Sequence, residues 1–204
     1  MIRILSSLAA LVLLAACAAA PQVDDPLADL GAFRLGHNVV VATKMQQSPV
    51  SRDATAEEWT AVLKPTLARR FGQYQGNQLY HLGISIEGFA LAPAGVPLLY
   101  KPKSALILNV TVWDDAAGTK LNAKPEQFTV FEQTTGESFL VGSGNKRTKE
   151  QQMAGLAANA ARKIEEWMAH KRKAEGWFEP RPGAATEAIV PRDELAPAAP
   201  SAQE

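Results

Sequence analysis

The chain of 204 residues contains a single cysteine, only three histidines and, after residue 17, no apolar run of membrane-spanning length. One cysteine excludes an intrachain disulfide. A membrane-spanning helix needs about 20 consecutive apolar residues, so a crossing after residue 17 is excluded. The formal net charge is zero, from 21 basic and 21 acidic side chains. This balance argues against nucleic acid or another polyanion as a partner.

Sequence motifs for catalysis and for metal binding are also missing. The three histidines lie far apart, at His37, His81 and His170, and none has a metal-ligand spacing such as His-Glu-x-x-His. No Gly-x-Ser-x-Gly nucleophile elbow occurs. Asp114 and Asp115 are adjacent, but neighbours on an extended chain point to opposite faces, and a turn explains them better than an acid pair. We therefore expect no metal, no cofactor and no enzymatic activity.

The first 17 residues carry the most specific signal in the sequence. Arg3 precedes an apolar core over residues 4–16, which is too short to span about 30 Å of hydrocarbon. Residues 1–16 are therefore predicted to be a cleaved export signal. The motif Leu14-Ala15-Ala16-Cys17 is similar to the lipobox of bacterial lipoproteins. The resemblance implies that Cys17 becomes residue one of the mature protein and carries a diacylglycerol on its sulfur, an anchor that needs no spanning helix.

The residues after Cys17 indicate which membrane holds the anchor. Positions 18 and 19 are both alanine, without the aspartate that marks retention at the inner membrane in bacteria whose sorting rule is known. We expect an outer-membrane lipoprotein that faces the periplasm. Residues 17–36 are predicted to be a lipidated, flexible tether, and residues 179–204 a disordered Pro/Ala-rich tail.

Residues 37–178 show the periodicities of one α+β domain. Two amphipathic helices are predicted, each opened by a capping box: Thr55 with Glu58, and Thr148 with Gln151. Pro65 is expected to kink or split the first of them. Five strands are predicted, over residues 37–45, 80–87, 106–113, 127–133 and 139–141. The order strand, helix, four strands, helix indicates a two-layer sandwich, a mainly antiparallel sheet with both helices on one face.

One candidate binding site precedes the second helix and comprises Ser143, Gly144, Lys146 and Arg147. Free amides at a helix N-terminus, together with two cations, can hold phosphate or a lipid head group. Phosphate-loop and dinucleotide spacings are absent, so a glycine turn into a capped helix is the alternative. The basic run at residues 170–173 complements the dipole at a helix end, or else contacts phosphates of lipid or lipopolysaccharide.

A second candidate is the sheet face turned away from the helices. Ile107 and Trp113 alternate out of phase with the neighbouring apolar residues, so they lie on that face. An exposed apolar face on a monomer marks a binding surface. Covering of this face by a long loop or by the tail is the alternative. Two aromatic residues of the following strands extend the candidate partner surface: Phe131 and Phe139.

Three parts of the domain resemble an uncharacterised family of small envelope lipoproteins of Gram-negative bacteria: TVWDD at 111–115, VGSG at 141–144, and the helix with QQM at 151–153 and NAARKIE at 159–165. The element order is similar to that of the lipopolysaccharide-assembly lipoprotein and of auxiliary lipoproteins of lipid-exporting ABC systems, which pair helices with an open sheet and act by binding. The resemblance implies a non-enzymatic binding or adaptor module in envelope assembly or lipid transport, with an envelope protein or lipid as partner. An envelope enzyme with an atypical site and a tether to peptidoglycan through the tail are the alternatives.

Overall fold

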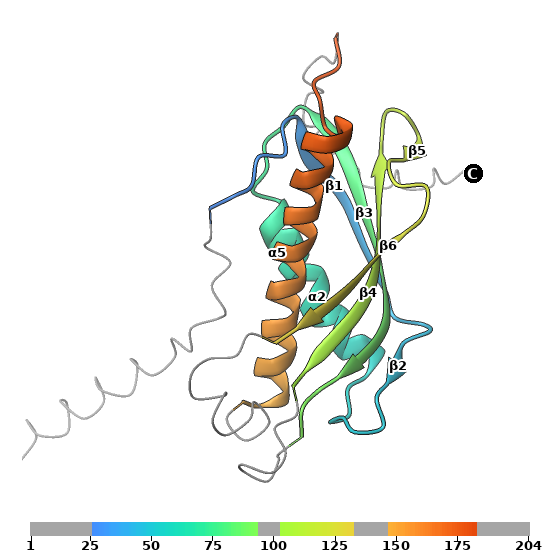
Figure 1. Ribbon diagram of the computed structural model, residues 1–204, viewed down its shortest axis with the longest axis vertical. Helices are drawn as coiled ribbons and strands as arrows, with labels where there is room; N and C mark the ends of the chain where they lie inside the picture. Colours follow the sequence, from blue (N-terminus) through green and yellow to red (C-terminus); the bar gives the residue numbers. More distant parts are fainter. Residues whose placement is uncertain (1–25, 94–102, 133–146, 183–204) are drawn as a thin grey trace, which may run out of the picture.

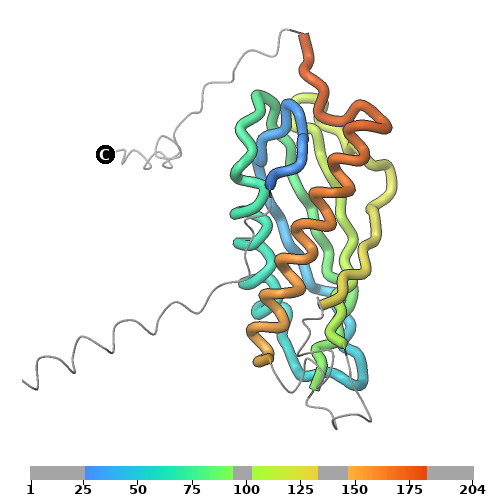
Figure 2. The backbone as a smooth tube through the Cα atoms, turned by 60° about the vertical axis from the view of Figure 1, so that its left-hand side comes forward, coloured from blue at the N-terminus to red at the C-terminus, as the bar shows by residue number. Residues whose placement is uncertain are grey.

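A computed structural model describes residues 26–93, 103–132 and 147–182 of the chain. In these residues two helices, α2 (Ala56–Phe71) and α5 (Lys149–Glu175), cover one face of a six-stranded sheet (Figure 1). α5 runs nearly the length of the domain, with α2 beside it (Figure 2). The predicted α+β architecture, with both helices on one face of the sheet, is confirmed.

The sheet is mixed. Its main strands follow the order β1 (Phe33–Val41), β3 (Gln78–Ala90), β4 (Ala105–Asp114) and β6 (Glu126–Phe131). Two short strands extend it: β2 (Gln46–Gln47) pairs with the end of β3, and β5 (Thr119–Lys120) pairs with the end of β4. β1 and β2 run parallel to β3, whereas β4 is antiparallel to β3, β5 and β6. The helix α2 is therefore the crossover that connects two parallel strands.

The domain begins earlier than the predicted boundary between residues 36 and 37. β1 starts at Phe33, which is fully buried, and Leu30 is buried as well. A register shift between Leu35 and Asn38 changes which side chains face the core. The alternation of buried and exposed side chains therefore changes phase at the bulge. The sequence pattern showed only the part of the strand after the bulge, so the strand was predicted at residues 37–45. Residues 30–36, which were predicted to belong to the tether, are therefore part of the folded domain.

The predicted helix ends are confirmed. The Thr55 hydroxyl accepts a hydrogen bond from the Glu58 amide at 3.2 Å, and the Glu58 carboxylate accepts one from the Thr55 amide at 2.9 Å. The second capping box, Thr148 with Gln151, has the same geometry. α5 ends at Gly176, whose φ of 72° lies in the left-handed region that favours glycine.

Pro65 lies inside one continuous helix, so the predicted split does not occur. Buried side chains flank the proline on both sides and hold both halves of α2 against the core: Trp59, Leu63, Leu67 and Phe71. Packing of this stripe outweighs the hydrogen bond that proline cannot donate.

The core lies between the helices and the sheet, as the periodicities predicted. The alternating residues of the two central strands are buried: Tyr80, Leu82, Ile84 and Ile86 of β3, and Leu106, Leu108, Val110 and Val112 of β4. Trp177 and Phe178 close the core at the C-terminal end of α5. The predicted strand at 139–141, with Phe139, and the tail from residue 183 onward lie outside the described residues.

Candidate functional site

The sheet face opposite the helices carries exposed apolar side chains. On β1, Val39 is 54% and Val41 is 43% exposed, and on β4 and β6 Trp113 is 39% and Phe131 is 59% exposed. Ile107 lies on the same face and is half-buried. Within the described residues this face has no covering helix (Figure 1). The structure thus brings the predicted partner residues Ile107 and Trp113 to one exposed face.

A groove of about 340 Å³ runs along β3 on this open face. Val39 and Val41 of β1 line one side, and Trp113 of β4 lines the other. The floor consists of small or polar residues that the strand pairing places side by side: Gly83 opposite Thr111, and Ser85 opposite Asn109. Ile107 does not line this groove. The sequence pattern found the exposed face but not the groove, because a groove depends on side chains of three strands.

His37 and His81, which are distant in sequence, come together at one end of the open face. Their ring centroids are 4.8 Å apart. His81 Nδ1 accepts a hydrogen bond from the His37 amide at 2.8 Å, so its proton is on Nε2, which lies 2.7 Å from Asp115 Oδ1. Both ring nitrogens of His81 are therefore used within the domain. No group of three or more metal-ligating side chains occurs in the described part of the chain.

The neighbouring acids Asp114 and Asp115 point to opposite faces, as predicted. Asp114 is buried on the helix side and accepts two hydrogen bonds from Arg181, at 2.9 and 3.0 Å. The Asp115 carboxylate binds His81 on the open face, and the Asp115 backbone carbonyl accepts a hydrogen bond from the Gly118 amide in the predicted turn. The two carboxylates therefore have separate structural partners and do not form an acid pair.

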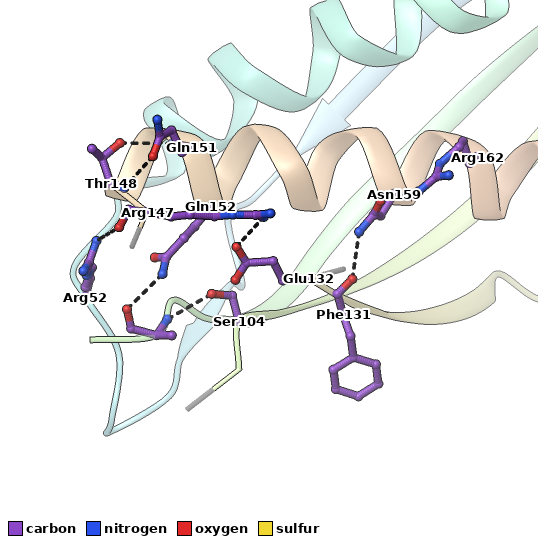
Figure 3. Close-up of polar contacts among 11 residues, drawn as sticks. Arg52, Ser104, Phe131, Glu132, Arg147, Thr148, Gln151, Gln152, Asn159 and Arg162 are labelled. Atoms are coloured by element: carbon purple, nitrogen blue, oxygen red, sulfur yellow. Dashed lines mark hydrogen bonds and ion pairs between the residues drawn. The ribbon is translucent and has the colours of Figure 1, made fainter. Parts of the chain in front are cut away.

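Of the predicted anion-binding residues, the structure describes Arg147 alone. Its Nη1 lies 2.7 Å from Glu132 Oε1, and the Glu132 side chain is only 2% exposed (Figure 3). The Arg147 carbonyl accepts a hydrogen bond from Arg52 at 2.9 Å. Arg147 therefore neutralises a buried carboxylate of this chain. Ser143, Gly144 and Lys146 lie outside the described residues, so the anion site as a whole stays a prediction.

The contacts around Arg147 join the start of α5 to the sheet. The Gln152 side-chain amide donates to the Ala92 carbonyl at 3.1 Å, and the Ala92 amide donates to the Ser104 hydroxyl at 3.1 Å (Figure 3). Asn159 donates to the Phe131 carbonyl at 2.9 Å. These bonds link the helix to the ends of β3, β4 and β6, which is a structural role.

The basic run at the end of α5 also has partners within the chain. Arg172 Nη1 lies 2.7 Å from Asp29 Oδ2, and Lys171 Nζ lies 2.5 Å from Glu175 Oε1. The Lys171 ammonium is also 5.8 Å from the centroid of the Trp177 ring. Arg172 therefore joins the helix end to the N-terminal segment, and Lys171 pairs within the helix end, so neither contact needs a lipid phosphate.

A buried polar cluster that sequence reasoning missed fixes the point where the chain enters the domain. Arg70 Nε and Nη2 donate to Glu165 Oε2 at 2.9 and 2.5 Å, and the Tyr74 hydroxyl donates to Glu165 Oε1. The pKa of Tyr74 is raised far above its ordinary value. Burial is the largest cause, and this hydrogen bond to a carboxylate is the second. Arg70 also donates to the Pro26 carbonyl at 3.1 Å. The cluster thus attaches the N-terminal segment to both helices.

Comparisons with known proteins found similar solved structures only at low sequence identity. No protein-family model and no curated protein match it. Among solved structures, a Xanthomonas campestris protein of family DUF330 shares 14% identity over 74% of this chain and 92% of its own, with a TM-score of 0.48. A putative lipoprotein from Caulobacter crescentus shares 17% identity over 71% and 93%, with a TM-score of 0.33. A minor lipoprotein from Acinetobacter baumannii shares 19% identity over 63% and 92%, with a TM-score of 0.29.

None of these three names states an enzymatic activity. Identities and TM-scores this low carry no argument about a ligand or a partner. The part of the chain that the structure describes contains no helix long and apolar enough to cross a membrane.

Proposed function

We propose that this chain is a non-enzymatic binding module, anchored to the outer membrane through lipid on Cys17 and facing the periplasm. The observation that carries the proposal is the open sheet face, where large apolar side chains stay exposed opposite a fully packed helix layer. Exposed apolar side chains gathered on one face mark an interaction surface. An envelope protein or envelope lipid is the proposed class of partner.

The fixed N-terminal segment determines how far the domain can stand from the membrane. Pro26 and Ala28 are held by hydrogen bonds from Arg70, at 3.1 Å, and from Tyr74, at 3.0 Å. Residues 18–25 alone therefore remain between the lipidated cysteine and the domain. This length reaches about 30 Å when taut and about 16 Å on average as a flexible chain. The anchored domain would therefore stay within about 30 Å of the bilayer.

The anchor is tested with Cys17→Ser in the native host. The variant lacks the thiol that accepts the lipid, so we expect the domain to fold but to leave the outer membrane, as soluble protein or as uncleaved precursor. Fractionation followed by immunoblotting measures this, and circular dichroism of the purified variant confirms folding. If the Cys17→Ser variant is recovered in the outer-membrane fraction in the same amount as wild type, the anchor is not this lipid.

The binding face is tested with a double variant, Trp113→Ser with Ile107→Asn. Both side chains are on the open face and outside the core, so the variant should fold and lose its crosslinked partner. In-cell crosslinking followed by mass spectrometry measures the capture. Leu27→Ser is the matched control, because Leu27 is apolar and 41% exposed but lies outside the sheet. Equal capture by the double variant and the control would rule out this face as the binding surface.

A further inference from the structure

Gly83 stands in the middle of β3, where the fold does not require a glycine. Its backbone does not adopt a positive φ, and a Cβ there would meet nothing closer than the Thr111 carbonyl oxygen at 3.9 Å, an ordinary contact. Gly36 differs, because a Cβ there would lie 2.5 Å from His81 Nδ1. Glycine inside a strand weakens it and often marks a place where a ligand or another backbone approaches closely. Gly83 thus leaves open the centre of the groove.

Neutral hydrogen-bonding groups form the rest of the groove floor. Ser85 is paired opposite Asn109, and Thr111 is paired opposite Gly83. Within the described residues, these three side chains make no hydrogen bond. The groove therefore offers two hydroxyls and one amide without internal partners, over about 13 Å from Asn109 to Trp113 at about 3.3 Å per residue.

The walls of the groove are apolar and its charges balance. Val39 and Val41 form one wall, and the indole of Trp113 forms the other. The Lys120 ammonium lies 5.2 Å from the centroid of the Trp113 ring, and Glu87 provides a carboxylate at the lining. One cation and one anion around a neutral floor match a ligand without net charge.

Other classes of ligand fit this combination poorly. An acyl chain over the floor would bury two hydroxyls and an amide without hydrogen bonds, which is costly. A phosphate or an acidic ligand would meet Glu87 as well as Lys120. A peptide that adds a strand uses a free sheet edge, whereas β3 and β4 already pair with each other beneath the groove.

We propose that the groove along β3 binds a neutral oligosaccharide. The inference rests on the proposed function, because it uses the same open face, and it goes beyond that function by adding a sugar to the envelope protein or lipid proposed above. A pyranose chain has apolar C–H faces, which stack on the indole of Trp113 and on the valines, and hydroxyl groups, which bond to Ser85, Asn109 and Thr111. The absent side chain at Gly83 allows a sugar ring to lie close to the sheet.

The test titrates the full chain with chitotetraose, maltotetraose and cellotetraose in lauryldimethylamine oxide micelles, a detergent without a sugar. Amide and indole resonances are followed by NMR, and at least one of the three sugars should shift those of Gly83, Thr111 and Trp113. The Cβ that Gly83→Val adds meets no atom closer than 3.9 Å, and valine favours strands, so the variant should keep the thermal stability, narrow the groove and weaken binding about tenfold or more. Leu27→Ser should bind like wild type.

Three results would overturn the proposal. The first is the absence of groove shifts with all three sugars, and the second is undiminished binding by Gly83→Val. The third is binding of a fatty acid by wild type, with shifts of the Gly83 and Trp113 resonances that Gly83→Val abolishes, which would assign the groove to an acyl chain. If crosslinking still captures a partner at Trp113 while no sugar binds, the proposed function stands and the oligosaccharide inference fails.

Discussion

At the scale of single residues, we expect the loss of the buried ion pair between Arg70 and Glu165 to cause a large decrease in the free energy of unfolding. The two side chains are 1% and 4% exposed. Breaking a buried pair leaves an uncompensated charge in the core, so Glu165→Leu should lower the free energy of unfolding by about 3–5 kcal/mol. Urea denaturation of the variant measures this loss.

A matched double variant separates the charge from the packing. Arg70→Met with Glu165→Leu removes both charges and replaces them with apolar side chains of similar volume, so it should cost clearly less than Glu165→Leu alone. If the single variant loses less than about 1 kcal/mol, the pair does not have the structural role assigned to it.

Sequence reasoning missed this pair because its members are 95 residues apart and charged residues on amphipathic helices ordinarily face water. A signal was present, since Arg70 lies three positions after Leu67 and beside Phe71, within the apolar stripe of its helix. Helical periodicity could therefore place Arg70 toward the core. Which carboxylate it meets depends on how α2 packs against α5, and that is not a local property.

At the scale of elements, the bulge in β1 requires a residue without a side chain at position 36. A Cβ there would lie 2.5 Å from His81 Nδ1, so Gly36→Ala must displace the imidazole and its bond to the His37 amide. We expect a loss of about 1–3 kcal/mol in the free energy of unfolding, measured by thermal denaturation. Gly83→Ala is the control and should be neutral or stabilising, because its new Cβ meets no close atom. Equal losses in both variants would contradict this account of the bulge.

Local features of the elements could be predicted, whereas long-range pairing could not. The capping boxes and the alternation in β3 and β4 depend on residues within one element, and these predictions are confirmed. The start of β1 was predicted four residues too late, because the bulge near Gly36 reverses the alternation. The parallel pairing of β1 with β3 was also missed, since a half-buried strand has the same period of two in either direction.

At the scale of the whole molecule, the described residues are arranged asymmetrically, with a packed helix layer on one side of the sheet and no covering element on the other (Figure 2). The sequence predicted both the face and Trp113 as part of it, since the parity of side chains along a strand follows from the chain itself. It did not reveal that Arg147 pairs with Glu132, because nothing local marks a buried partner 15 residues away. The groove and the closeness of His37 to His81 likewise depend on neighbouring strands.

The measurement that tests the central claim most directly is hydroxyl-radical footprinting of Trp113. Its reactivity is compared between the native outer membrane and the purified full chain in detergent, with Val50, an exposed loop residue, as the internal reference. If the open face holds a partner in the envelope, Trp113 should be protected several-fold in the membrane while Val50 reacts equally in both samples. Equal reactivity of Trp113 in the two samples would contradict the account.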